Sequence, residues 1–225
     1  MQITVRKITD IGLLREMAEM TTGKTCKMNL FTAYKNLHSL VRTQIFVIKF
    51  YGIPTSVMGH LVRHVHAQPY ALGKRTDRGG EDFGIECFDF GQRLDILAEN
   101  VHESMTEEEV QSFVDALNEM ETEVKSWPNK YDRNKPVNVG LLVNAEEIIN
   151  ISRQRLCSMA AKETRMIWQQ ALDLIEEIDP DLVKFCKRPC VLSGVCRESK
   201  PCGYMASNAY RFERETYKNL FKPKV

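Results

Sequence analysis

Apolar and polar positions alternate in three stretches of the chain, and this pattern predicts β-strands. Residues 3–5 and 46–50 show the alternation with β-branched and aromatic side chains on one face. A third stretch, 81–87, follows Gly79 and Gly80, which predict a turn. The chain is therefore expected to contain at least three strands of a half-buried sheet.

Other stretches repeat their apolar residues every three or four positions, as one face of an α-helix does. Asp10 can cap a helix that runs through Met20, and Ser104 with Glu107 can begin another. The predicted helices are 10–20, 31–41, 54–64, 105–127 and 144–180. The last of these is the longest. We therefore expect an α+β fold, a twisted sheet flanked by long helices.

Composition narrows the class of protein only slightly. The chain has 225 residues and is 43% hydrophobic, which suits one sizeable domain or two small ones. A net charge of +1 gives no electrostatic reason to expect nucleic acid or a membrane surface as a partner. No signal peptide or long apolar stretch is recognised, and an odd number of cysteines, seven, favours a reducing compartment. A cytoplasmic enzyme is expected.

Basic residues follow the predicted helix that begins after Gly52. Pro54 can occupy its first turn, and Arg63 and His64 stand at its end, followed by an irregular polar stretch that contains Arg75. A guanidinium offers a fixed fork of donors that suits phosphate and carbonyl oxygens. The alternative is a solvated basic helix end, where cations meet the helix dipole favourably.

A second group of polar residues begins the longest predicted helix. Asn144 and Glu147 have the spacing of a capping box. Arg155 lies eleven residues after Asn144, which is three helical turns, so both are expected on one face, with Asn150 well round the helix. In the alternative interpretation, Asn144 is only a helix cap and Arg155 a surface cation. For Asn144 the two roles are compatible, because a helix N-terminus also attracts anions.

Cysteines are concentrated in the tail. Four thiolates could hold zinc or an iron–sulfur cluster. The four are Cys186, Cys190, Cys196 and Cys202. Their spacing lacks the close Cys-x-x-Cys pair, which favours free or oxidised thiols in a loop, so no metal site is predicted. The remaining cysteines are interpreted as small buried residues: Cys26, Cys87 and Cys157.

In order and register, these three segments resemble the flavin-dependent thymidylate synthases. The family's Arg-His-Arg, Ser and Ser-x-Arg-Tyr signature aligns without a gap, as does its later Asn-x-Arg to Leu-Arg segment, and some bacterial members end in a comparable cysteine-rich tail. The matching residues are Arg63, His64, Arg75, Asn144, Asn150, Arg155, Ala160, Glu163 and Arg165. The resemblance implies a catalytic domain over 1–185 and a cysteine-rich extension over 186–225.

The resemblance also implies an activity and roles. The family's FAD, recharged by NADPH, takes a one-carbon unit from methylenetetrahydrofolate and delivers it to C5 of dUMP, giving dTMP, in homotetramers whose sites lie between subunits. Flavin would contact Arg63, His64, Asn144 and Asn150. The nucleotide would contact Arg75, Gly73, Arg155 and His60. Arg75 and Arg155 would act in catalysis by neutralising phosphate and polarising uracil.

Several positions depart from the family pattern. Where the family has its second Arg and a later flavin-contacting Arg, this chain has Val65 and Glu146. The other replacements are His60 for Gln, Gln68 and Gly73 for two serines, and Thr76 for Tyr. A loop arginine of the family has no clear counterpart, although Arg133 is a candidate. Two alternatives to thymidylate synthesis stay open: methylation or hydroxymethylation of another pyrimidine nucleotide, and a catalytically silent scaffold.

Overall fold

The computed structural model describes residues 1–71 and 135–222. The strand expected at 81–87, the helix expected at 105–127 and Cys87 lie outside these residues. No helix in the described part of the chain is long and apolar enough to cross a membrane.

Four antiparallel strands form one sheet in the order β1-β2-β4-β3. They are β1 (Gln2–Lys7), β2 (Ile45–Pro54), β3 (Ala67–Ala71) and β4 (Pro136–Asn144). The alternation at 3–5 and 46–50 correctly predicted β1 and β2. The irregular stretch expected after His64 is wrong, because 67–71 pairs with β4 as an edge strand. An edge position tolerates Pro69, whose missing N–H need not join a ladder.

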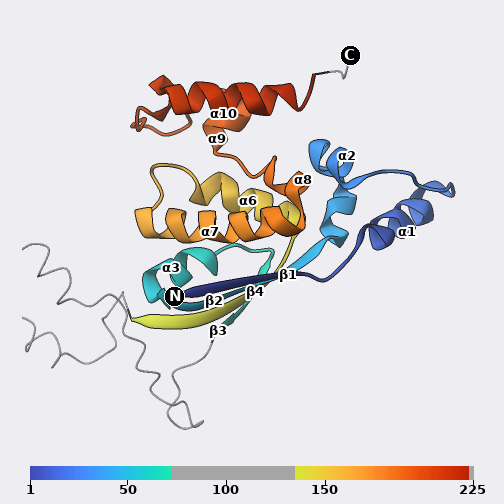
Figure 1. Ribbon diagram of the computed structural model, residues 1–225, viewed down its shortest axis with the longest axis horizontal. Coiled ribbons are helices and arrows are strands. Elements are labelled where there is room, and N and C mark those ends of the chain that lie inside the picture. Colours follow the sequence, from blue (N-terminus) through green and yellow to red (C-terminus); the bar gives the residue numbers. More distant parts are fainter. Residues whose placement is uncertain (72–134, 223–225) are drawn as a thin grey trace, which may run out of the picture.

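Helices are stacked on one side of this sheet (Figure 1). Helices α6 (Ala145–Arg155) and α7 (Lys162–Ile178) lie between the sheet and a further layer made by α9 (Pro189–Ser193) and α10 (Asn208–Asn219). The shorter elements are α1 (Ile11–Thr22), α2 (Leu30–Lys35), η1 (Ser39–Thr43), α3 (Thr55–Leu61), α8 (Pro180–Val183) and η4 (Tyr204–Ala206). The structure therefore confirms the expected mixture of sheet and helices, and it shows that the strands pair in antiparallel fashion.

The helix expected at 31–41 is broken in two. Helix α2 ends at Lys35, Leu37 adopts a positive φ of 45°, and the chain resumes as the 3-10 helix η1. The ring of His38 accepts a hydrogen bond from the backbone N–H of Leu40, 3.3 Å away, and so caps the new turn. Local capping and the burial of Leu40 and Val41 outweigh the cost of the left-handed residue.

The long helix expected at 144–180 is also two helices. Its first part was predicted correctly, because Asn144 caps α6 by accepting from the N–H of Glu147 at 2.9 Å. The chain then turns back after Leu156, and the indole N–H of Trp168 donates to Ser152 Oγ at 3.0 Å. This buried contact between α7 and α6 is a tertiary interaction that local periodicity does not encode.

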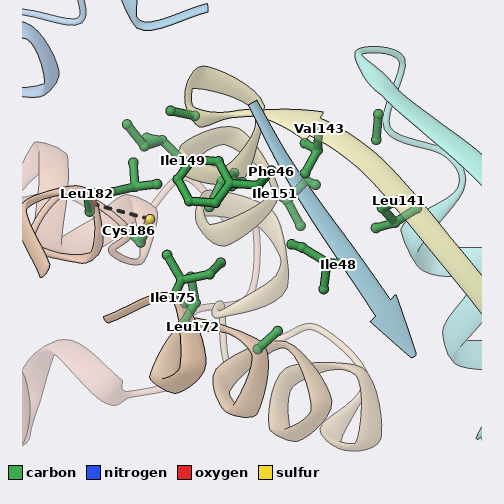
Figure 2. Close-up of a cluster of buried hydrophobic side chains, with 14 of the residues drawn as sticks. Phe46, Ile48, Leu141, Val143, Ile149, Ile151, Leu172, Ile175, Leu182 and Cys186 are labelled. Carbon is green, nitrogen blue, oxygen red and sulfur yellow. Dashed lines mark hydrogen bonds between the residues drawn. The ribbon is translucent and has the colours of Figure 1, made fainter. Parts of the chain in front are cut away.

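The core lies between the inner face of the sheet and helices α6 to α8 (Figure 2). Phe46, Ile48 and Phe50 are completely buried on this face, as the alternation predicted. Cys186 sits in the same core, where its thiol donates to the carbonyl of Leu182, 3.5 Å away. Burial raises the pKa of Cys186 to about 12, so this thiol stays protonated at neutral pH.

Asp179 joins three parts of the fold at the end of α7. Its carboxylate accepts from Lys7 Nζ of β1 at 2.6 Å and from the hydroxyl of Tyr34 of α2 at 2.7 Å. Its second oxygen accepts from the backbone N–H of Leu182 at 3.2 Å and caps α8. Asp179 is 3% exposed, so a buried charge holds sheet and helices together through satisfied hydrogen bonds.

Candidate functional site

The two polar segments singled out in the sequence meet beside the sheet. His64 follows α3, which ends at Leu61, and Arg155 is the last residue of α6. The Nε of Arg155 donates to Nε2 of His64 at 3.1 Å, across 91 residues of sequence. Arg155 Nη2 also donates to the carbonyl oxygen of His60 at 2.6 Å. The structure thus brings together residues that the sequence assigned separately to flavin and nucleotide.

Arg155 keeps donor capacity beyond these two contacts. A guanidinium carries five N–H groups, and the two contacts to His64 and His60 are those it makes within the described residues. Burial, with a smaller effect of Arg63, lowers the pKa of Arg155, yet an arginine pKa starts so high that the group remains a cation. A half-buried cation with unused donors can bind an anionic oxygen.

His64 is held in its neutral form. The ring is 6% exposed, and burial together with the Arg155 cation lowers its pKa to about 4. Because Arg155 can only donate, Nε2 of His64 must accept, and the ring proton resides on Nδ1. Nδ1 lies 3.4 Å from Oε1 of Glu147, which can receive that proton in a hydrogen bond.

Glu147 is a site residue that sequence analysis missed. It occupies the capping-box position of α6, but its side chain turns away from the cap, toward His64. Its Oε2 accepts from Asn150 Nδ2 at 3.4 Å, and Asn150 Oδ1 accepts from Arg153 Nη1 at 3.2 Å. A polar chain therefore runs from Arg155 through His64, Glu147 and Asn150 to Arg153. The sequence predicted that Asn150 lies well round the helix from Asn144 and Arg155. In the structure, its hydrogen bond to Glu147 connects it to the site.

His60 and Arg63 complete the local cluster. The Nδ1 of His60 lies 2.7 Å from the hydroxyl of the buried Thr164 on α7. Burial lowers the pKa of His60, and the Arg155 and Arg63 cations lower it further. Arg63 itself is exposed. The two arginines thus create a positive potential around neutral histidines, which suits an anionic ligand.

Four of the replaced positions lie within the described residues: His60, Val65, Gln68 and Glu146. Val65 is 82% exposed and supplies no polar group. Glu146, at a position where the family has an arginine, forms an ion pair with Arg42. Gly73, Arg75, Thr76 and Arg133 lie outside the described residues.

The cysteine set considered from the sequence is not assembled. Cys186 lies in the core (Figure 2), whereas Cys190 belongs to α9, and Cys196 and Cys202 lie between α9 and η4. Cys26 and Cys157, interpreted as small buried residues, are both only partly buried. Within residues 1–71 and 135–222, no three His, Cys, Asp or Glu side chains are close enough to hold one metal ion.

The depressed pKa of His64 makes stability depend on pH. The unfolded chain binds a proton near the ordinary pKa of 6.5, whereas folded His64 resists protonation down to about 4. The contribution of neutral His64 to stability is therefore fully present above the unfolded pKa and is lost as pH falls through this window, by about 3 kcal/mol. Urea unfolding of the parent and of His64→Gln at several pH values measures this loss of stability.

The parent should lose more stability than His64→Gln as the pH falls from 6.5 to about 4. His66→Gln, at the nearby exposed histidine, should keep the parental dependence, and equal dependence in all three proteins would contradict the assignment.

Comparison with known proteins supports the fold. No protein-family model matches the chain, and no curated protein matches it. A solved structure of thymidylate synthase X from Helicobacter pylori with FAD and dUMP matches with a TM-score of 0.53 and 14% identity, over 83% of this chain and 99% of that one. A second structure of the flavin-dependent enzyme from the same organism, also with FAD and dUMP, matches with a TM-score of 0.53 and 14% identity, over 84% and 100%. The chain therefore has a fold similar to that of the flavin-dependent thymidylate synthase structures.

Proposed function

We propose that this protein is a flavin-dependent methyltransferase that acts at C5 of a pyrimidine nucleotide, with dUMP as the first candidate substrate. The observation that carries the proposal is the contact between His64 and Arg155. These residues come from two segments that match the family signature separately, and the fold joins them at one site. A catalytically silent scaffold would have no need of this hydrogen bond between the two segments, so its presence favours an active site.

The residues present fit FAD in part. Arg63 supplies positive charge for phosphate groups, and Asn144 stands at the N-terminus of α6. Neutral His64 sits behind Arg155 and orients it through Nε2. By the resemblance, Arg63, His64, Asn144 and Asn150 would hold the cofactor. Val65 and Glu146 leave two of the family's cationic contacts unfilled, so weaker flavin affinity than in a member with both arginines is expected.

In the proposed reaction the cofactor supplies reducing equivalents, drawn from NADPH, while methylenetetrahydrofolate is the one-carbon donor. The chain supplies position and charge. Arg155 would direct its remaining N–H groups to a phosphate or a uracil carbonyl oxygen, which polarises the base toward attack from C5. His64 keeps the Arg155 fork in place and Glu147 keeps the tautomer of His64. Arg75, Gly73 and His60 would complete the nucleotide contacts, and the site would be shared within a homotetramer in the cytoplasm.

A second pyrimidine nucleotide is the alternative substrate. The ion pair between Glu146 and Arg42 favours this alternative. An acidic residue, held by Arg42, stands where the family has a cation, so the charge of the site differs from that of the family. A pocket altered in this way can select a different base or sugar, since site groups left unpaired reject the wrong ligand.

The test uses purified full-length protein. We expect a yellow protein whose flavin is bleached by NADPH and which releases the C5 hydrogen of dUMP in the presence of methylenetetrahydrofolate. Parallel assays with dCMP and UMP distinguish the alternative substrate. His64→Ala should lose flavin, while His66→Ala, at a neighbouring exposed position, should stay yellow. A folded protein that binds no added FAD and turns over none of these nucleotides would overturn the proposal.

A further inference from the structure

Four cysteines line one cavity between the end of α6 and the segments around α9 and η4. The cavity has a volume of about 290 Å³, and its walls come from the turn after α6, from α9 and from the loop that leads to η4. The cysteines that line it are Cys157, Cys190, Cys196 and Cys202. Cys157 replaces Cys186 of the set considered from the sequence.

Side chains fasten these three segments to one another. Arg188 Nη1 donates to Ser158 Oγ at 3.0 Å, which ties the start of α9 to the turn that carries Cys157. The Arg188 guanidinium also stacks on the ring of Tyr204, 4.0 Å from its centroid. Arg214 of α10 donates to the carbonyl of Leu192 at 2.8 Å, near the αL residue Gly194. These contacts hold the walls of the cavity in place.

Its walls are electropositive. Arg153, Arg188 and Arg197 line it together with the cysteines, against one acidic residue, Glu198. The Nε of Arg153 is buried and has no hydrogen-bond partner among the described residues. Four thiolates would bring four negative charges, and these cations could offset the excess that remains after a metal centre binds.

A backbone hydrogen bond reaches one of these sulfurs. The N–H of Tyr204 donates to the sulfur of Cys202. Hydrogen bonds of this kind to cysteine sulfur also tune bound clusters.

We propose that Cys157, Cys190, Cys196 and Cys202 bind a [4Fe–4S] cluster in this cavity. A single zinc ion needs sulfurs about 2.3 Å from one centre, and no such group exists among the described residues. A cluster spreads its ligands, because each thiolate binds a different iron, and a cavity of about 290 Å³ gives it space. Four thiol protons leave as four S–Fe bonds form, with no change in oxidation state of the protein.

The proposed cluster would have a structural role and would take no part in methyl transfer itself. Arg153 lines the cavity and donates to Asn150, which contacts Glu147 in the candidate site. A cluster would therefore fix the end of α6, including the segment that carries Arg155.

Anaerobic purification of the full chain, followed by iron and acid-labile sulfide analysis, tests the proposal without any assay of activity. We expect about four of each per chain, after reconstitution with iron and sulfide where needed, and a reduced form with an electron paramagnetic resonance signal. Flavin colour does not interfere with either chemical analysis. Single replacements Cys157→Ser and Cys202→Ser should lose most of the iron while circular dichroism shows a folded chain; Cys202 is exposed, so its replacement should not disturb folding.

Matched controls are Cys26→Ser and Cys186→Ala, which should keep the iron because neither thiol lines the cavity. Loss of iron in Cys186→Ala with retention in Cys157→Ser would overturn the ligand set. Zinc in place of iron, or a folded chain that takes up no iron and sulfide on reconstitution, would overturn the cluster.

Discussion

Replacing Asp179 with alanine is expected to lower the free energy of unfolding by about 3–5 kcal/mol. The carboxylate is 3% exposed and accepts from Lys7 and Tyr34 on two other elements. Its removal leaves the partly buried ammonium of Lys7 without its counter-ion and the Tyr34 hydroxyl without its acceptor. Chemical denaturation of the purified variant measures the loss.

The chain offers a matched control two residues away. Asp181 pairs with Lys184 at 2.6 Å, with side chains 36% and 44% exposed. Such an exposed pair contributes at most about 1 kcal/mol, so Asp181→Ala should be nearly silent. Asp179→Asn should fall between the two, because the amide can still accept from Tyr34 but carries no charge for Lys7. Equal losses in Asp179→Ala and Asp181→Ala would contradict the structural role given to the buried carboxylate.

Apolar periodicity and capping residues correctly predicted the elements that depend on neighbouring residues in the sequence. The alternation at 46–50 survives as β2 because its apolar face meets the core, and Asp10 and Asn144 cap α1 and α6 as expected. The breaks in the predicted helices arise elsewhere. The turn after Leu156 is stabilised when Trp168 reaches Ser152, a contact between residues sixteen apart that no helical period contains. Periodicity identifies buried faces, whereas chain reversals depend on which buried faces meet.

The candidate site could likewise be predicted from the sequence only in part. Arg155 and His64 could be selected from the sequence, because their residue types and register match a family signature. Their mutual hydrogen bond could not, since it joins residues 91 positions apart. Glu147 escaped selection because its position after Asn144 already had a local explanation as a capping residue. A buried carboxylate one turn from a cap is a signal that only packing reveals. Packing also reveals that Cys157, and not Cys186, lines a cavity with Cys190, Cys196 and Cys202.

Arg155→Ala is expected to weaken nucleotide binding by roughly ten- to a hundredfold while flavin stays bound. This expectation rests on the proposed role of Arg155, whose unused donors would meet a phosphate or base carbonyl in a charge-assisted hydrogen bond worth about 1.5–3 kcal/mol. Calorimetric titration of dUMP into the flavin-loaded variant measures the change. Arg155→Lys keeps the charge but not the fork, so it should bind with intermediate affinity. Gln154→Ala, at the exposed neighbouring position, should bind as the parent does.

The same variant has a second readout that is independent of any nucleotide. Arg155 contributes to the low pKa of His64, after burial, which is the larger cause. Removing the cation should therefore raise the pKa of His64 from about 4 but leave it below the ordinary 6.5, because burial remains. Nuclear magnetic resonance titration of the His64 ring gives both values. A raised pKa with unchanged nucleotide affinity would keep the contact and remove Arg155 from the nucleotide site. An unchanged pKa would instead show that the two side chains do not interact in solution.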